Sequence, residues 1–152
     1  MKNVKKIVLV LLVAFVGIQF IPTERNQSAI VSITDFMLVN KVPNNIKNKL
    51  QVSCYDCHSN NTNYPWYNKM QPVAWFLEDH IKEGKAELNF SEWGSLSSRR
   101  KASKLRSIIK QIESGQMPLS SYTLIHNDSK FSEVEAQRII KYMEKLKDSI
   151  TN

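Results

Sequence analysis

The chain of 152 residues lacks any cysteine beyond the pair Cys54 and Cys57, so no disulfide framework is available to replace a hydrophobic core. It also lacks a dense basic stripe. The formal net charge is +7, but Lys2, Lys5 and Lys6 at the N-terminus contribute three of these charges, which leaves about +4 for the rest of the chain. That surplus is too small for a typical nucleic-acid-binding protein, and no nucleic-acid partner is expected. No long segment alternates with the period of a strand and no repeat is present, so we predict one all-α domain of ordinary size.

The N-terminus pairs those lysines with an uncharged apolar run from Ile7 to Ile21, an arrangement typical of an export signal. No small-x-small cleavage triplet follows the run. Counted from Val4, the stretch is 18 residues long, close to the minimum of about 17 that crosses a bilayer. We therefore predict an N-terminal membrane segment that places the rest of the chain on the periplasmic side of the cytoplasmic membrane. The predicted division is a signal anchor or signal peptide over 1–21, a polar tether over 22–34 and the folded domain over 35–152.

Apolar spacing predicts helices that begin near Pro43 and Pro72, a helix over 97–114, and a last helix that opens at Ser132. Ser132 and Glu135 have the spacing of a capping box. The first helix would carry the cysteine pair at its C-terminal end. Side chains expected to face the core are Ile46 and Leu50 in the first helix, Val73, Phe76, Leu77, His80 and Ile81 in the second, Ala102, Leu105, Ile109 and Ile112 in the third, and Ile139, Met143, Leu146 and Ile150 in the last.

The main chemical signal is the pentapeptide Cys54-Tyr55-Asp56-Cys57-His58, which has the C-x-x-C-H pattern of haem attachment. Two thiols separated by two residues can each form a thioether with a haem vinyl group. The histidine that follows directly then brings an imidazole to the iron. We therefore predict a covalently bound haem c with iron on His58.

Three other interpretations of the pentapeptide explain it less well. A thioredoxin-like redox pair needs a βαβ context, which the helical pattern does not provide. A structural zinc site needs four ligands, and although His80 and His126 are available, no second paired motif exists. A disulfide between Cys54 and Cys57 would close a very small loop and would not explain the neighbouring His58.

For the second axial position the sequence offers Met117, His80 and His126. Met117 is preferred because it precedes Pro118, whose ring fixes the local backbone and stops a helix from continuing, so that a loop presents the side chain. His80 lies on the apolar stripe of its helix and is the alternative ligand. A cluster of aromatic residues after the motif is expected to supply flat apolar walls for the porphyrin: Trp66, Tyr67, Trp75, Phe76, Phe90 and Trp93.

Several motifs occur in order between Val42 and Leu146. They are Cys54-Tyr55-Asp56-Cys57-His58-Ser59-Asn60, Tyr64-Pro65-Trp66-Tyr67, Pro72-Val73-Ala74-Trp75, Leu88-Asn89-Phe90-Ser91-Glu92-Trp93, Met117-Pro118-Leu119 and Tyr122-Thr123-Leu124-Ile125-His126. With them the chain resembles the bacterial haem-binding domain family, which is related to cytochrome c. The resemblance implies a small cytochrome c-like helical domain with covalent haem at Cys54 and Cys57 and His58 as proximal ligand. It also supports Met117 as the distal ligand, and it implies no particular reaction or partner.

Three hypotheses of function follow from these residues. A haem held by His58 and Met117 has no open position for a substrate, which favours an electron carrier rather than an enzyme. Its partner would be a redox protein or a respiratory membrane complex. The alternative is a haem-based sensor in which Met117 dissociates and a small ligand replaces it; a third hypothesis is an exported interaction domain without haem.

Overall fold

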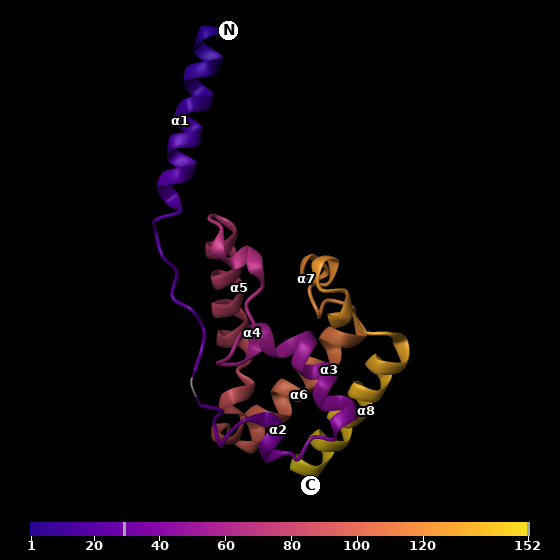
Figure 1. The fold of residues 1–152 in the computed structure, drawn as a ribbon. Coiled ribbons are helices and arrows are strands. Elements are labelled where there is room, and N and C mark those ends of the chain that lie inside the picture. The colour runs from indigo at the N-terminus through magenta and orange to yellow at the C-terminus, as the bar shows by residue number, and fades with distance from the viewer. Residues whose placement is uncertain (29, 152) are drawn as a thin grey trace.

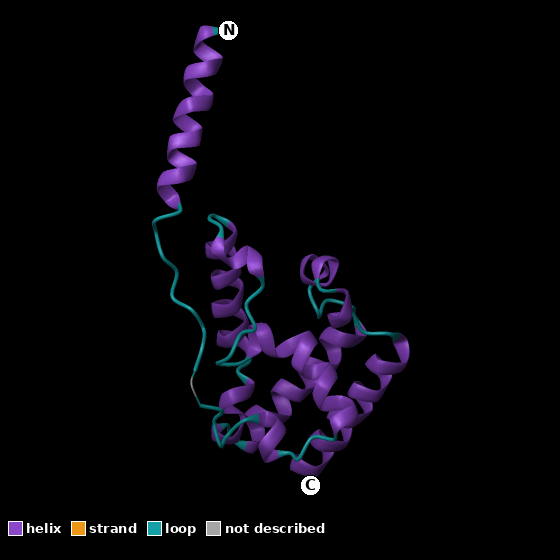
Figure 2. Ribbon diagram, in the orientation of Figure 1, coloured by secondary structure: helices purple, strands orange, loops and turns teal. Residues whose placement is uncertain are grey.

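The computed structural model describes residues 1–28 and 30–151, and within these residues it contains helices and loops but no β-strand (Figures 1 and 2). The all-α prediction is confirmed. In chain order the elements are α1 (Lys2–Ile18), α2 (Phe36–Val39), α3 (Asn44–Leu50), the π-helical turn η1 (Gln51–Tyr55), α4 (Asp56–His58), the 3-10 helix η2 (Trp66–Lys69), α5 (Val73–Glu87), the 3-10 helix η3 (Phe90–Ser95), α6 (Ser98–Glu113), α7 (Ser120–Ile125), the 3-10 helix η4 (Asn127–Ser129) and α8 (Glu133–Thr151).

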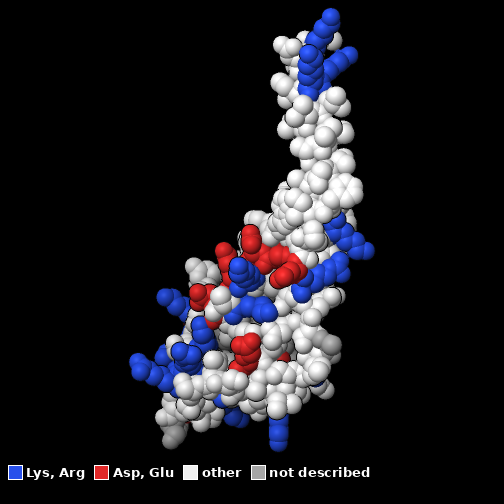
Figure 3. Space-filling model, turned by 90° about the vertical axis from the view of Figure 1, so that its left-hand side faces the viewer, with Lys and Arg blue, Asp and Glu red and all other residues white. Residues whose placement is uncertain are grey.

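The predicted N-terminal membrane segment is wrong. Among the described residues, no helix combines the length and the apolar character that crossing a membrane requires. The helix α1 has 17 residues, and Lys2, Lys5 and Lys6 fall within it. It stands away from the domain, with basic side chains at its far end (Figures 1 and 3), and none of its residues is buried.

The segment after α1, which was predicted as a polar tether, runs along the domain and is hydrogen-bonded to it. Asn26 is the centre of these contacts: its Nδ2 donates to the carbonyl of Ser59 at 2.7 Å and to Oγ1 of Thr62 at 2.9 Å, and its backbone N–H donates to the hydroxyl of Tyr64 at 2.6 Å. Lys85 Nζ donates to Asn26 Oδ1 at 2.6 Å. These partners lie in the loop that directly follows α4 and on α5, so this segment braces the region around the cysteine motif.

The hydrophobic core lies between α6, α8, α3 and the short helices around η3. On α6 the four predicted core positions are all buried, and on α8 Ile139 and Met143 are buried. The aromatic part of this core is Phe36 packed against Phe90 and Trp93, with ring centroids 5.1 and 4.9 Å apart. Burial of these rings packs η3 against α2. The C-terminal end of α3 leads directly into the cysteine motif.

Helix α5 departs from the predicted stripe. Ala74 and Ile81 are buried, whereas Val73 and Phe76 are 42% and 65% exposed. Helix α5 contacts both α4 and η2, and its covered face includes Ala74 near its start and Ile81 further along (Figure 1). An apolar spacing of three and four residues identified the helix, but not which of its faces is covered.

Candidate functional site

A continuous helical run brings the cysteine motif to the centre of the domain. Leu50 at the end of α3 is fully buried, and the chain continues through η1 into α4, where His58 is the last residue. Ser53 anchors the turn η1, because its buried hydroxyl donates to the carbonyl of Ser129 at 2.7 Å. A π-helical turn within a helix is often found at functional sites, and here it lies immediately before and within the motif.

The two thiols are free and sit in a poorly hydrated environment. Burial raises the pKa of Cys54 to about 12, and the neighbouring Cys57 adds to the effect. Burial, with a smaller contribution from Asp56, raises the pKa of Cys57 to about 11. Both groups are therefore protonated thiols at neutral pH, a form that attacks disulfides and binds metals poorly.

His58 is oriented by backbone carbonyls. Its Nδ1 lies 2.8 Å from the carbonyl oxygen of Gly84 and 3.0 Å from that of Leu88. Since both neighbours are acceptors, Nδ1 carries the proton and donates it, which leaves the lone pair on Nε2. Burial lowers the pKa of the imidazole and keeps it neutral. This is the arrangement of a metal-binding histidine whose second nitrogen is held by an outer hydrogen bond.

The helix α5 approaches α4 closely at Gly84. A Cβ at this position would lie 2.8 Å from the carbonyl oxygen of Cys57 and 3.3 Å from its Cβ. Glycine therefore allows the backbone contact that delivers the Gly84 carbonyl to His58.

Two hollows adjoin the motif. The first hollow has a volume of about 300 Å³, and the second has a volume of about 240 Å³. Cys54, His58 and Met117 line both hollows, and Cys57 lines the first. The remaining apolar lining is Leu119 in the first hollow and Leu50, Leu88, Phe90, Ile108, Ile112 and Phe131 in the second. Together the hollows fall within the size range of small-molecule and cofactor sites.

Two of the three candidates for the second axial position, Met117 and His80, line the first hollow, whereas His126 lines neither hollow. Met117 is half-buried, and its backbone N–H donates to the carbonyl of Gln111 at 3.2 Å, which holds its loop against the end of α6. His80 is also half-buried; its Nδ1 lies 2.9 Å from the carbonyl oxygen of Phe76, and its ring packs on Phe76 with centroids 4.3 Å apart. That contact leaves Nε2 of His80 as its free ring nitrogen.

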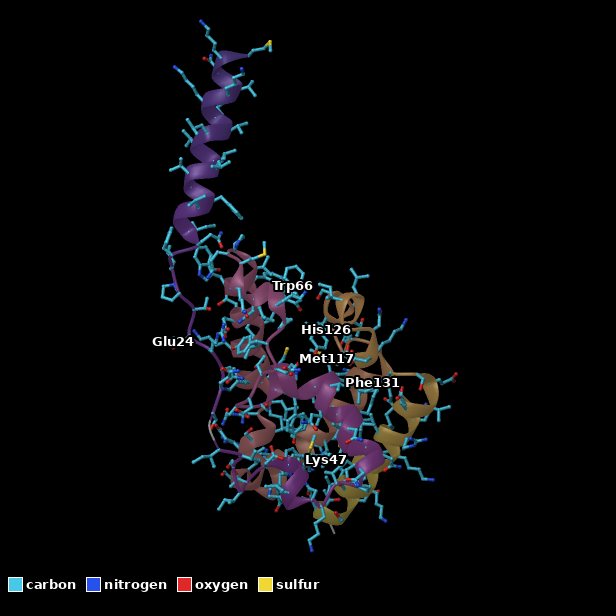
Figure 4. All side chains as sticks on the ribbon, viewed as in Figure 1. Glu24, Lys47, Trp66, Met117, His126 and Phe131 are labelled. Atoms are coloured by element: carbon cyan, nitrogen blue, oxygen red, sulfur yellow. The ribbon has the colours of Figure 1, made fainter. Side chains whose placement is uncertain are left out.

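The structure does not place Trp66 or Trp75 among the residues that line either hollow. Trp66 is 74% exposed and lies toward the open ends of α5 and α7, beyond His126 and Met117 (Figure 4). Trp75 lines a separate, open groove with Thr23, Glu24 and Asn26. Of the predicted aromatic residues, Phe90 lines the second hollow, and the other apolar walls come from residues of α3, α6 and the loop before α8.

A polar bridge that no sequence pattern indicated connects α4 and η2 to α7. The Tyr122 hydroxyl donates to Oδ2 of Asp56 at 2.7 Å, and burial with this hydrogen bond raises the pKa of Tyr122. The ring of Tyr122 stacks on His126 with centroids 4.4 Å apart, and His126 Nε2 is hydrogen-bonded to the Tyr67 hydroxyl at 2.8 Å. The partners are separated by 59 and 66 positions in sequence, so only the folded chain pairs them.

This geometry lacks the features that a zinc site or a thioredoxin-like redox pair would need among the described residues. The described residues include no group of three or more His, Cys, Asp or Glu side chains placed to hold a metal ion by themselves. Nor do they supply the strands of a thioredoxin-like context. In contrast, paired thiols, an imidazole with a free Nε2 and two flanking hollows, the second of them largely apolar, fit a flat, iron-containing macrocycle.

A comparison with protein families agrees with this chemistry. A family model described as a haem-binding domain matches residues 13–145. The match begins well before the motifs noted in the sequence and includes the segment around Asn26 that braces the site. No curated protein and no solved structure matches the chain.

Proposed function

The chain belongs to the haem-binding domain family, and from this membership we propose that it is a monohaem c-type cytochrome domain that transfers electrons. The observation that carries the proposal is the His58 imidazole, with Nδ1 hydrogen-bonded to two carbonyls and Nε2 free between two hollows that Cys54 also lines. When bound, haem supplies one-electron chemistry at its iron.

We propose that Cys54 and Cys57 hold the haem covalently. Each thiol would add across one vinyl group, so that a carbon–sulfur bond forms and the thiol hydrogen moves to the other vinyl carbon. The addition consumes no oxidant or reductant. The raised pKa values of both thiols favour the protonated form that supplies this hydrogen, and they slow the competing formation of a disulfide.

We propose His58 and Met117 as the axial ligands. The two carbonyls on Nδ1 would keep the His58 ring in one orientation and raise its basicity as a ligand. Support for Met117 comes from its position, because it lines both hollows, as His58 and Cys54 do. His80 lines the first hollow but not the second. Two protein ligands would leave no open position, which suits a carrier of electrons better than a sensor of small ligands.

Addition of carbon monoxide to the ferrous protein tests this ligand pair. We expect little or slow spectral change in the wild type and in His80→Phe, and rapid, complete change in Met117→Ala. If His80→Phe opens the site and Met117→Ala does not, His80 is the distal ligand. Rapid binding by the wild type itself would favour the sensor function over electron transfer.

We propose that the domain works on the periplasmic side of the cytoplasmic membrane and exchanges electrons with a redox protein or a respiratory complex. The support is the N-terminal pattern of lysines followed by an apolar run, which is typical of export. Fractionation of cells that produce the chain tests the location. We expect the haem-containing protein in the periplasmic fraction or on membranes, accessible to protease added from the periplasmic side. Recovery of the haem-containing protein from the cytoplasm would contradict the proposal.

A further inference from the structure

We propose that Lys104 on α6 binds a carboxylate of the haem and so fixes which edge of the haem enters the second hollow. The inference rests on the proposed function, because it takes haem as the occupant of the two hollows. It adds a residue that neither the motifs nor the family match assigns.

The charges around the two hollows differ in sign. The first hollow is lined by Asp56, Glu83 and Glu87 and by no Lys or Arg of the described chain. The second hollow is lined by Lys104, and Glu87 lies at the border that both hollows share. Haem carries two propionate carboxylates, which an acidic wall repels and an ammonium group attracts. The electrostatics therefore favour an orientation in which a propionate lies on the α6 side.

The side chain of Lys104 is available for this role. It is half-buried, and within the described part of the chain its ammonium group forms neither a salt bridge nor a hydrogen bond. Lys104 and His58 line the same hollow. A cation that is partly removed from water without an anionic partner is costly unless a ligand supplies the partner.

The neighbouring residues of α6 extend this polar edge. Ser107 and Gln111 follow Lys104 by three and seven positions, so they lie on the same face of the helix, and both line the second hollow. The carbonyl of Gln111 accepts the backbone N–H of Met117 at 3.2 Å. One face of α6 therefore combines a cation, two further hydrogen-bonding side chains and the anchor of the Met117 loop.

The reduction potential of the haem protein, measured as a function of pH, tests the proposal. We compare Lys104→Gln with Lys110→Gln, a matched control at an exposed position of the same helix outside both hollows. Loss of the ammonium group would leave a carboxylate uncompensated near the iron and favour the ferric form. We expect the ratio of ferric to ferrous protein at a fixed potential to rise up to about tenfold, a shift of about 59 mV to lower potential.

The pH profile should change as well. A carboxylate beside a cation has a lowered pKa, so in Lys104→Gln the pH at which protonation of the carboxylate raises the potential should move upward. Lys110→Gln should match the wild type. Lys104→Arg should restore the wild-type profile, and it keeps the test decisive if Lys104→Gln binds less haem.

Two outcomes would overturn the inference while leaving the proposed function intact. One is a Lys104→Gln protein that binds haem covalently and has the same potential and pH profile as Lys110→Gln. The other is equal loss of haem from Lys104→Gln and Lys104→Arg, because the second variant retains the charge. Absence of haem from the matured wild type would overturn the proposed function and this inference together.

Discussion

The close approach of α5 to α4 makes Gly84→Ala the sharpest test of how the His58 side of the site is built. The added Cβ would meet the carbonyl oxygen of Cys57 at 2.8 Å and its Cβ at 3.3 Å. The nearest atom belongs to the backbone, so the contact is relieved only if the two helices separate. The Gly84 carbonyl, which accepts the Nδ1–H of His58 at 2.8 Å, would move with α5.

The expected magnitude combines two opposite effects. Overpacking in a close-packed region costs about 1–3 kcal/mol, and the upper end applies because backbone must shift. Alanine in the interior of a helix is about 1 kcal/mol more favourable than glycine. We therefore expect Gly84→Ala to lower the free energy of unfolding by about 2 kcal/mol, which reduces the folding equilibrium constant by roughly 30-fold.

Denaturant titration followed by circular dichroism measures this change, with Gly17→Ala as the matched control. Gly17 is also a helical glycine, but nothing lies within 4 Å of a Cβ at that position. The control should be no less stable than the wild type. If Gly84→Ala also kept or raised the stability, the close contact between α4 and α5 would be wrong, and with it the account of what orients His58.

Two further predictions concern stability. Asn26→Ala removes three side-chain hydrogen bonds, to the Ser59 carbonyl, to Thr62 and from Lys85; at about 0.5–1.5 kcal/mol each, reduced by partial exposure, it should cost about 2 kcal/mol in denaturant titration. Asn63→Ala, at an exposed position nearby, should leave the free energy of unfolding almost unchanged. Equal losses of stability in the two variants would refute the bracing role of the segment around Asn26. Ser132→Ala should cost about 1 kcal/mol at pH 7 by removing the N-terminal cap of α8. The backbone N–H and the hydroxyl of Ser132 both donate to the Glu135 carboxylate and lower its pKa. Ser132→Ala removes the hydroxyl bond, whose contribution is present above the ordinary glutamate pKa and is lost as the pH falls through the lowered value, whereas the cap bond from the Glu135 N–H to Oγ of Ser132 does not depend on pH. The stability difference between the two proteins should therefore shrink at low pH, and a difference that stays constant would contradict this.

Local signals predicted the helices of the second half of the chain well. The spacing of Ala102, Leu105, Ile109 and Ile112 identified the buried face of α6, and all four residues are buried. The capping box at the start of α8 is present, with the Glu135 N–H donating to Oγ of Ser132 at 3.3 Å. These features depend on residues three to seven positions apart, which a sequence pattern contains directly.

Features that depend on distant residues were not predictable in the same way. The burial of α5 follows from where η2 and α4 pack, and Phe76 remains exposed despite its apolar spacing. The segment around Asn26 reads as a polar tether because its partners, such as Ser59 and Tyr64, lie more than 30 positions away. In both cases the local composition is the same whether or not a distant partner covers it.

The candidate site shows the same division. The motif containing Cys54, Cys57 and His58 is local, and it identified the cofactor class that the family match supports. The carbonyl of Gly84 that orients His58 comes from another helix, as does the charge of Lys104. The sequence motif therefore predicted thiol and imidazole groups that the fold places beside two hollows, but it did not indicate the groups that hold them in place.

We propose above all that one haem is bound covalently through both cysteines of the motif. Intact mass measured under denaturing conditions, on protein produced with a working cytochrome c maturation system, tests it most directly. We predict that the wild type carries the added mass of one haem and that the double variant Cys54→Ser/Cys57→Ser carries none. A wild-type chain whose mass equals that of the bare polypeptide, with any pigment separating from it on denaturation, would contradict the claim.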